Sequence, residues 1–450
     1  MKIVVIGGNA AGMSAASRAR RNDPNAEITV YEKDDTVSYG ACGLPYFVEG
    51  AIPDWQKLIA VPLQDFIEKR NISVHVLHEV KAINPRKKTL TVYDHPNERT
   101  LEVQYDRLVI ATGARAVVPP IPGTDHERVF KLRTLDDGKA IHAFINRHQP
   151  KQALIVGGGY IGLEMAEALT ARGMQVSIVE MMPHVMPLMD ADMAEVIQEE
   201  LTRQKVQVYT DVSVKEIIAQ GEQLQAVLAD GRKLTSDLIL LSVGVRPNTE
   251  LAESCGVELG PTGAIRVNDR MQTNIRDILA AGDCAEAKHL VTNKPAYIPL
   301  GTTANKQGRI AGDNATGRAS RFKGIVGTSG FKVFDLEAAM TGLSSQELAR
   351  LQIPFKAVKI KSRTRAHYYP NPARIHVKLL FSPQDGRLYG GQIVGGEGSA
   401  KRIDVLATAL HQKMTVADLA ELDLSYAPPF APVWDALLIA ANQAVKQVRK

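Results

Sequence analysis

The chain has 450 residues, of which 45% are hydrophobic and 23% charged, and its formal net charge is +5. This length predicts about three domains, and no uninterrupted apolar run approaches the roughly 18 residues of a membrane span, so no membrane partner is expected. The basic residues are scattered and aromatic residues make up only 5% of the chain, which argues against a nucleic-acid partner.

The chain opens with a pattern typical of a dinucleotide-binding fold. An apolar strand at residues 2–6 runs into a glycine-rich turn at 7–12, an amphipathic helix at 13–22 and a strand at 27–31 that ends at an acid. Glycine lets the backbone approach a pyrophosphate, the helix N-terminus offers N–H donors, and the acid accepts ribose hydroxyls. Asn9 stands where the middle glycine of the motif falls. The candidate cofactor-binding residues are Gly7, Gly8, Ala11, Gly12, Glu32 and Lys33.

A single cysteine follows in the segment SYGACGLPY at residues 38–46. The start of a predicted helix favours a thiolate, so we expect a lowered pKa and a reactive thiol at Cys42. Gly40 and Gly43 would let a flat ring or a disulfide approach, whereas the alternative is a small buried hydrophobic residue. Position 47 holds Phe47 rather than a second cysteine, so the redox cycle would use a mixed disulfide, a persulfide or a sulfenic acid on Cys42 alone.

The other two cysteines, Cys255 and Cys284, are predicted to be structural. The three cysteines show neither metal-ligand spacing nor an even-numbered disulfide framework. This usage is typical of a reducing compartment, so we expect a cytoplasmic protein without a metal site.

The dinucleotide pattern occurs a second time further along the chain. A strand at residues 153–156 runs into a glycine turn at 157–162, a helix, and a strand at 175–179 that ends at an acid. This copy fits the GxGxxG motif fully, and no arginine follows Glu180 in residues 181–183. An acid at that position favours NADH over NADPH, whose extra phosphate it would repel. The candidate cofactor-binding residues here are Gly157, Gly159, Tyr160, Ile161, Gly162 and Glu180.

Together these segments resemble those of one flavoprotein family. Besides the two glycine motifs and SYxxCGLPY, they include ATG at the end of residues 105–113, GD at the end of 278–283, KRIDVLATAL from Lys401 and YAPPF at 426–430. On these motifs the chain resembles the single-cysteine branch of the pyridine nucleotide-disulfide oxidoreductases and looks most like the coenzyme A disulfide reductases. The resemblance covers the whole chain.

The resemblance implies an α/β fold class with two Rossmann-like dinucleotide-binding domains and a C-terminal α+β dimerisation domain. FAD would bind a discontinuous domain of residues 1–124 and 250–325, because the family acid that falls on Asp283 binds the flavin ribityl chain. NADH, with NADPH as an alternative, would bind residues 125–249, and residues 326–450 would form a homodimer interface. Further cofactor-binding residues implied by the family are Ala111, Thr112, Gly113, Gly244, Gly282, Asp283 and Thr303.

The resemblance also implies the positions of a substrate and a proton donor. Two tyrosines that the partner subunit supplies in the family fall on Tyr368 and Tyr426, whose hydroxyls would protonate a departing thiolate. Arginines suit the phosphates of a coenzyme A tail. The family positions that hold this tail align with Ser14, Arg18, Arg21, Ser38, Arg70 and Asn305. Asn305 stands where the family can carry a histidine, and Ala41 stands where it can carry an asparagine.

The leading functional hypothesis is an FAD-dependent NAD(P)H oxidoreductase that reduces coenzyme A disulfide through a Cys42–coenzyme A mixed disulfide. The alternatives within the enzyme class are an NADH-dependent persulfide or polysulfide reductase and an NADH oxidase. The first glycine turn lacks the histidine that NADH oxidases and NADH peroxidases carry there, which argues against peroxide chemistry. The alternative outside the enzyme class is a flavin-binding redox sensor or electron-transfer partner.

Overall fold

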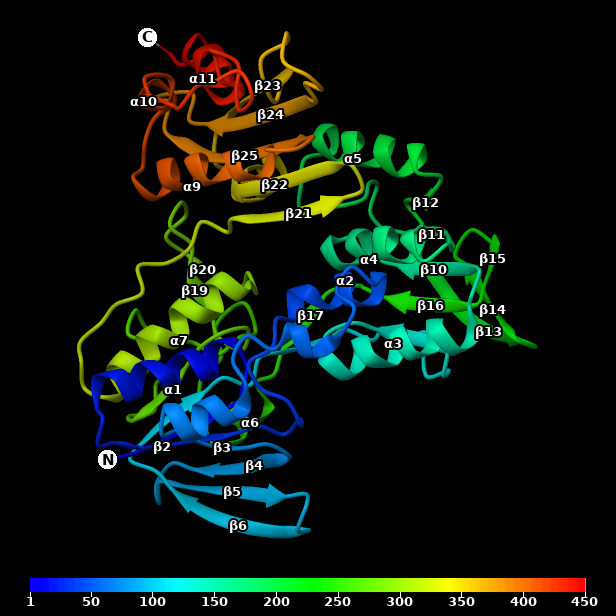
Figure 1. Ribbon diagram of the computed structural model, residues 1–450. Helices are drawn as coiled ribbons and strands as arrows, with labels where there is room; N and C mark the ends of the chain where they lie inside the picture. The colour runs from blue at the N-terminus through cyan, green and yellow to red at the C-terminus, as the bar shows by residue number, and fades with distance from the viewer. Residues whose placement is uncertain (450) are drawn as a thin grey trace.

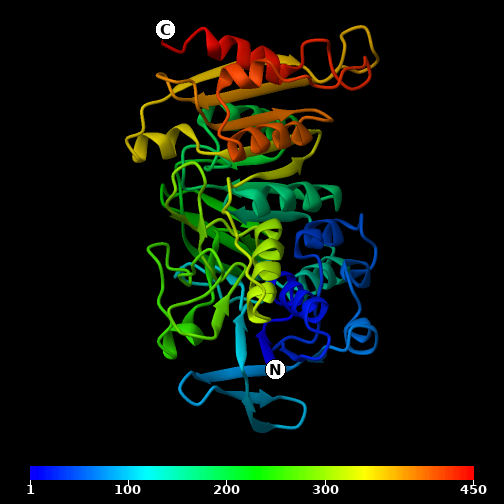
Figure 2. The same ribbon diagram turned by 90° about the vertical axis from the view of Figure 1, so that its left-hand side faces the viewer.

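The computed structural model describes residues 1–449. Its three main sheets follow one another along the long axis of the molecule, with the C-terminal sheet at one end and the hairpin sheet β4–β6 at the other (Figures 1 and 2). Among the described residues no helix is both long enough and apolar enough to cross a membrane.

The first main sheet has five parallel strands in the order β18-β7-β1-β2-β3. Ile6 aligns with Tyr31 on one side and with Ile110 on the other, so the glycine turn and the ATG segment leave the same edge of the sheet. Ala280 also aligns with Ile110, which adds the GD segment to that edge. The strands are β1 (Lys2–Ile6), β2 (Glu27–Tyr31), β3 (Ser73–His75), β7 (Arg107–Ile110) and β18 (Ile278–Ala280).

Helix α1 (Ala10–Asn22) packs along helix α7 (Gly301–Ala315), and the two lie side by side in Figure 1. A Cβ atom on Gly308 would lie 2.2 Å from a backbone oxygen of α1, and one on Gly312 would lie 2.4 Å from another. This close approach therefore requires glycine at both positions. Helix α1 begins at Ala10 rather than at residue 13 as predicted, because the glycine turn passes directly into the first helical turn.

The second main sheet repeats the architecture of the first. Its five parallel strands have the order β12-β11-β10-β16-β9, and β10, α4 and β11 repeat the succession β1, α1 and β2. The short antiparallel pair β8 and β17 lies where the chain enters and leaves this unit. The elements are β8 (Ala114–Ala116), β9 (Val129–Lys131), α3 (Leu135–His148), β10 (Gln152–Val156), α4 (Tyr160–Ala171), β11 (Gln175–Val179), α5 (Ala191–Arg203), β12 (Gln207–Tyr209), β16 (Leu238–Leu241) and β17 (Val245–Pro247).

The third main sheet is antiparallel, in the order β21-β22-β25-β24-β23. The strands predicted at 374–381 and 388–394 are β24 and β25, and helices α9 and α11 contribute to their core. With two parallel sheets and one antiparallel sheet, the predicted α/β fold class is confirmed. The elements are β21 (Ser329–Val333), β22 (Leu336–Gly342), α8 (Ser345–Arg350), β23 (Lys356–Arg363), β24 (Arg374–Phe381), β25 (Leu388–Gly395), α9 (Ile403–His411), α10 (Val416–Ala420) and α11 (Ala436–Val445).

Smaller elements complete the fold. Two three-stranded antiparallel sheets extend from the parallel ones, β4-β5-β6 from the first and β13-β14-β15 from the second. The bounds are α2 (Leu44–Glu49), β4 (His78–Asn84), β5 (Thr89–Asp94), β6 (Arg99–Gln104), β13 (Val214–Gln220), β14 (Gln223–Leu228), β15 (Lys233–Ser236), α6 (Glu250–Ser254), β19 (Ala287–Lys288) and β20 (Pro295–Ala296).

A buried histidine in β24 predicts an acid-sensitive fold. His376 is 8% exposed, and burial together with the charges of Lys359, Lys361 and Arg374 lowers the pKa of its imidazole to about 4. The unfolded chain takes up this proton near pH 6.5 and the folded chain only near pH 4, so stability is lost as the pH falls between these values. The loss due to this one group is at most about 3 kcal/mol.

The measurement is urea denaturation at a series of pH values for the wild type and for His376→Gln. We expect the unfolding free energy of the variant to fall less steeply between pH 6.5 and 4. The control His148→Gln removes an exposed histidine and should keep the wild-type slope. Parallel slopes for wild type and His376→Gln would show that His376 does not titrate in this way.

Candidate active site

The first glycine turn brings three backbone segments into contact. Gly7 has a φ of +106°, and a Cβ atom on it would lie 2.2 Å from the carbonyl oxygen of Ala111. A Cβ atom on Gly12 would lie 1.8 Å from the carbonyl oxygen of Gly7. The Glu32 carboxylate accepts a hydrogen bond of 2.6 Å from the Gly8 N–H, and burial raises its pKa. The turn therefore has no room for side chains, as close approach of a pyrophosphate requires.

The second glycine turn has the same geometry. Gly157 has a φ of +108°, and the buried Glu180 carboxylate accepts a hydrogen bond of 2.7 Å from Gly158. Asn9 is the N-cap of α1 and makes no side-chain capping bond within the described chain. Gly159, the N-cap of α4, has no side chain that could make one. An N-terminus with free N–H groups favours a phosphate ligand, so the residues present fit one dinucleotide at each turn.

The other predicted cofactor residues lie in the turns at the same sheet edges or near them. Gly113, Gly244 and Gly282 all have positive φ angles. Thr112 donates a hydrogen bond of 2.7 Å to the carbonyl oxygen of Asn248, whose amide donates one of 2.8 Å back to Thr112. The hydroxyl of Tyr160 is 2.7 Å from that of Ser329, so this side chain points toward the third sheet. Lys33 is exposed, whereas Ile161 and Thr303 are half-buried.

An ion pair joins the two dinucleotide units beside the GD segment. Arg133 lies 2.6 Å from the Asp283 carboxylate and also donates to the carbonyl oxygen of Ala114. Tyr297 donates a hydrogen bond of 3.0 Å to the backbone of Asp283, and burial raises the pKa of this tyrosine. Neither Arg133 nor Tyr297 could be predicted as a site residue, because neither belongs to a glycine motif.

Cys42 lies in a 3₁₀ turn, Ala41–Gly43, directly before helix α2. Its side chain is exposed in the single chain. A Cβ atom on Gly43 would lie 2.4 Å from a Leu58 methyl group, so this glycine is required by packing, whereas one on Gly40 would meet nothing closer than 3.7 Å. The open space at Gly40 and the exposed thiol allow a substrate to reach the sulfur.

The expected lowering of the Cys42 pKa is wrong. Although the thiol can be reached from the surface, the surrounding chain desolvates it, and this burial raises its pKa. The carboxylates of Glu164 and Asp283 raise it further, and Arg133 opposes them. A helix of only six residues has too small a dipole to outweigh these effects.

The predicted substrate residues gather along α1 and α7. Ser14 donates a hydrogen bond of 2.7 Å to Asn305, and Arg70 donates one of 3.1 Å to the Ser17 hydroxyl. Arg18 is paired with Asp313 at 2.5 Å. Ser38, with a φ of +54°, donates its N–H to the Gly8 carbonyl beside the glycine turn. The predicted substrate residues therefore extend from the first glycine turn to a group of four arginines, Arg18, Arg21, Arg70 and Arg309.

Arg21 belongs to that group. Its side chain is exposed, but partial desolvation and repulsion from the charges of Arg18, Arg309 and Arg70 lower its pKa. Arg309 is exposed on α7 and was not predicted, because it is remote in sequence from the other three. Such a group suits an anion with several phosphates.

The two predicted catalytic tyrosines lie together. The hydroxyls of Tyr368 and Tyr426 are 3.2 Å apart, and the two side chains are 65% and 45% exposed. Within residues 1–449 of one chain neither hydroxyl is hydrogen-bonded to Cys42. Phe430, Val433 and Trp434 on the same segment are also exposed, at 75%, 65% and 61%. An exposed group of large apolar side chains is typical of a protein interface.

Two family models together match nearly all of the chain. The model described as pyridine nucleotide-disulphide oxidoreductase matches residues 1–308. The chain belongs to this family. The model of the dimerisation domain of the pyridine nucleotide-disulphide oxidoreductases matches residues 328–437. The predicted family is therefore confirmed, and the match to the dimerisation domain indicates a homodimer.

Relatives and solved structures match over almost the full length. The chain is 38% identical to "NADH oxidase" of Methanocaldococcus jannaschii, covering 100% of this chain and 99% of the relative. It is 39% identical to "NAD(P)H sulfur oxidoreductase (CoA-dependent)" of Pyrococcus abyssi, covering 98% and 97%. The structure of reduced Bacillus anthracis CoADR-RHD superimposes with a TM-score of 0.97 at 39% identity, covering 99% of this chain and 80% of that one.

Membership of this family establishes the class of enzyme. The chain is an NAD(P)H-dependent flavoprotein of the pyridine nucleotide-disulphide oxidoreductase family, as predicted. Both glycine turns have the geometry that FAD and NAD(P)H require. The alternative of a flavin-binding sensor without enzymatic activity is not favoured by these matches.

A second carboxyl group beside the thiol gives a testable pH dependence. Glu164 lies on α4, two residues beyond the second glycine motif, and burial together with Glu167 raises its pKa to about 7. When ionised, its charge raises the pKa of Cys42. We therefore expect Glu164→Gln to lower the pKa of the thiol, measured as the pH dependence of Cys42 alkylation by iodoacetamide in the reduced enzyme.

The matched control is Glu49→Gln on helix α2. This substitution removes a carboxylate close to Cys42 in sequence and should leave the alkylation profile unchanged. A Glu164→Gln profile that coincides with the wild type would show that the two groups do not interact.

Proposed function

We propose that the chain is a homodimeric reductase that carries electrons from NADH, through FAD, to coenzyme A disulfide by way of Cys42. FAD would bind residues 1–124 and 250–325, NADH residues 125–249, and the partner subunit residues 326–450. NADH is preferred because the buried Glu180 carboxylate at the second turn would repel the extra phosphate of NADPH.

One observation carries the proposal. The exposed Cys42 thiol lies near Asp283 at the end of the first sheet and near Glu164 on the helix that follows the second glycine turn. The other cysteines are poorly placed for this chemistry, since Cys284 is fully buried and the thiol of Cys255 donates a hydrogen bond to a backbone oxygen. A single thiol between two dinucleotide sites can exchange with a disulfide but cannot form an internal dithiol.

The arginine group supports coenzyme A as the thiol carrier. Arg21, Arg70 and Arg309 offer positive charge for the phosphates, and Ser14 and Asn305 lie along the same helix pair. Ser38, the first residue of the SYGACGLPY segment, donates its N–H to the Gly8 carbonyl, so this segment begins beside the first glycine turn. A substrate with phosphates at one end and sulfur at the other would fit this arrangement.

Cys42 performs the exchange steps in this proposal. Its thiolate attacks one sulfur of coenzyme A disulfide, which releases one coenzyme A thiolate and leaves the other coenzyme A bonded to Cys42. FAD held at residues 1–124 and 250–325 would supply the electron pair, taken from NADH as a hydride, that reduction of the Cys42–coenzyme A disulfide requires. The second coenzyme A thiolate then leaves and the Cys42 thiolate is restored.

The departing thiolates require protons, and we assign their delivery to Tyr368 and Tyr426 of the partner subunit. The two hydroxyls are hydrogen-bonded to each other, and each side chain is accessible from the surface on which a second subunit would sit. The hydrogen bond to Tyr368 raises the pKa of Tyr426, so its hydroxyl is protonated at neutral pH.

Two other electron acceptors remain as second candidates. Reduction of a persulfide or polysulfide uses the same thiol, and the Pyrococcus abyssi relative is named a CoA-dependent sulfur oxidoreductase. Reduction of oxygen is suggested by the name of the Methanocaldococcus jannaschii relative. Oxygen reduction by a flavin needs no thiolate, so it makes no use of the open space at Gly40 and Cys42.

The deciding experiment is anaerobic oxidation of NADH by the purified FAD-containing protein. Coenzyme A disulfide, a polysulfide and a coenzyme A persulfide are supplied separately, and oxygen uptake is measured in air. Fastest turnover with coenzyme A disulfide supports the proposal. Turnover with only the polysulfide or the persulfide, or rapid oxygen uptake without any disulfide turnover, would replace it by the corresponding alternative.

A further inference from the structure

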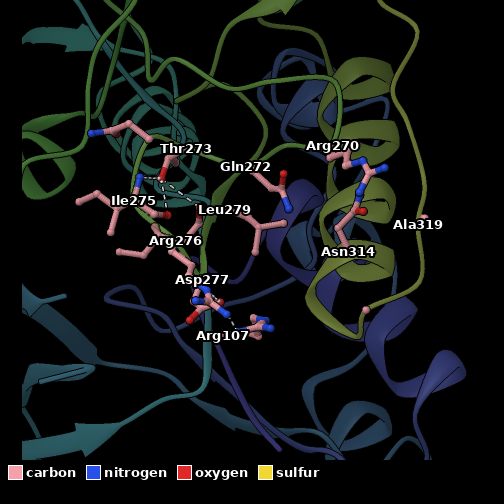
Figure 3. Close-up of a pocket in the computed structure, with 13 residues that line it drawn as sticks. Arg107, Arg270, Gln272, Thr273, Ile275, Arg276, Asp277, Leu279, Asn314 and Ala319 are labelled. Atoms are coloured by element: carbon pink, nitrogen blue, oxygen red, sulfur yellow. Dashed lines mark hydrogen bonds and ion pairs between the residues drawn. The ribbon is translucent and has the colours of Figure 1, made fainter. Parts of the chain in front are cut away.

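A basic groove lies at the edge of the first sheet opposite to the first glycine turn. Its floor is formed where β7 begins, at Arg107, and where the chain enters β18, at Asp277. Dinucleotides bind beyond the carboxyl ends of parallel strands, so the amino ends of β7 and β18 are outside the cofactor sites. Figure 3 shows Arg107 beside Asp277, with Arg270 and Asn314 at the opposite wall.

The groove has the size of a ligand site. Two adjoining hollows, of about 460 and 540 Å³, share Arg107, Ile275, Arg276 and Asp277 as lining residues. Pockets for small molecules commonly have volumes of about 300 to 1,000 Å³. The pair could hold one elongated molecule or two smaller ones.

The lining is strongly positive. Five cationic side chains face the two hollows, and among the described lining residues Asp277 is the one carboxylate. Asp277 is already paired, with Lys88 at 2.6 Å and with Arg107. The cations are Arg86, Lys88, Arg107, Arg270 and Arg276. The five cations and one carboxylate give the groove a net charge of +4, whereas the whole chain has a net charge of +5. Such a local excess of positive charge attracts anions.

Arg270 and Arg86 are the lining cations without an ion pair among residues 1–449, and Arg270 is the less exposed of the two. Its side chain is half-buried in the wall, and no carboxylate within residues 1–449 forms an ion pair with it. A guanidinium group that is partly removed from water without a counter-charge is unfavourable, and a bound anion would relieve this cost. Arg276, 93% exposed at the rim, and Gln272, Thr273 and Asn274 supply further donors.

We propose that this groove binds the triphosphate group of a small polyanion. Several guanidinium groups spread over two joined hollows match a chain of phosphates better than a single carboxylate or phosphate. Two joined hollows of this volume favour a small molecule over nucleic acid, which requires a continuous basic stripe. The site is independent of the proposed reductase activity.

The test is calorimetric titration of the FAD-containing enzyme, saturated with NAD⁺ and coenzyme A, with inorganic tripolyphosphate and with ATP. We expect both to bind, because both carry a triphosphate, and we expect Arg270→Ala and Arg276→Ala each to raise the Kd about tenfold. Arg276 is 93% exposed, so its replacement does not endanger folding. Tighter binding of ATP than of tripolyphosphate would identify a nucleotide, and the reverse order an inorganic chain.

The control is Arg266→Ala, which removes an exposed arginine paired with Glu258 outside the groove and should leave the Kd unchanged. Three results would overturn the proposal: no binding to the wild type, binding that survives both groove substitutions but is lost in Arg21→Ala, or tighter binding of duplex DNA than of tripolyphosphate. NADH oxidation should be the same in all groove variants, so failure here is distinct from failure of the proposed function.

Discussion

Replacing Cys42 with serine is expected to slow the NADH-dependent reduction of coenzyme A disulfide by at least about 10³-fold. A serine hydroxyl cannot form the mixed disulfide, and removal of an attacking group that forms a covalent intermediate abolishes the step it performs. Binding of both dinucleotides should survive, because each glycine turn is built from backbone contacts that do not involve Cys42. NADH should therefore still bleach the flavin absorbance of the variant in a single turnover.

The matched control is Cys255→Ser, which removes a half-exposed thiol and should leave turnover within about twofold of the wild type. A mixed disulfide on Cys42 should be visible as a mass increase equal to coenzyme A after oxidised wild-type enzyme is isolated. Wild-type turnover in Cys42→Ser would contradict the sulfur-centred mechanism whichever acceptor is used. Loss of flavin reduction in Cys42→Ser would instead indicate that the substitution damages cofactor binding.

The two glycine turns could be predicted closely from the sequence, because their geometry is local. Gly7, Gly12 and Gly157 are each required by a backbone contact within a few residues or across one strand, so the motif itself encodes the contact. The repeated strand, turn and helix then fixes two parallel sheets, whose carboxyl edges collect the remaining turns. Family resemblance added the third sheet, for which the local pattern showed only β24 and β25.

What could not be predicted depends on contacts between distant segments. Arg133 reaches Asp283 across 150 residues, and Arg309 joins Arg21 because α7 packs on α1. The pKa of Cys42 was wrongly predicted for the same reason: desolvation and the charge of Glu164 come from elements remote in sequence, whereas the helix argument considered only the nearest residues. Local motifs therefore locate a site more reliably than they determine its electrostatics.

The junction between the second and third sheets contains a buried ion-pair network. Lys378 of β24 lies 2.8 Å from Asp190 and 2.7 Å from Asp192, at the start of α5. Asp190 also accepts hydrogen bonds from the N–H and hydroxyl of Ser345, and its own N–H donates to Gln392 of β25. The side chains of Lys378 and Asp190 are only 10% and 4% exposed. The network ties the predicted NADH-binding unit to the dimerisation domain.

We expect Lys378→Met to lower the free energy of unfolding by about 3 to 5 kcal/mol. Burial raises the pKa of Asp190, but hydrogen bonds from Lys378 and Ser345 outweigh this and hold it below its usual value. Without Lys378 the buried carboxylate loses its counter-charge, so the variant should also unfold more readily as the pH rises and Asp190 ionises. The measurement is guanidinium denaturation at pH 7 followed by circular dichroism.

Two comparisons separate a lost counter-charge from a general effect of the substitution. Lys81→Met breaks an exposed pair with Glu79, whose side chains are 50% and 35% exposed, and should cost at most about 1 kcal/mol. In the double variant Asp190→Asn, Lys378→Met the uncompensated charge is gone, so part of the lost stability should return. If Lys378→Met costs no more than Lys81→Met, the network does not hold the two units together. Their relative position then depends on the other contacts of this junction, such as the ion pair of Arg203 with Asp335 and the rings of Tyr160 and Phe331, which pack edge to face at 5.2 Å.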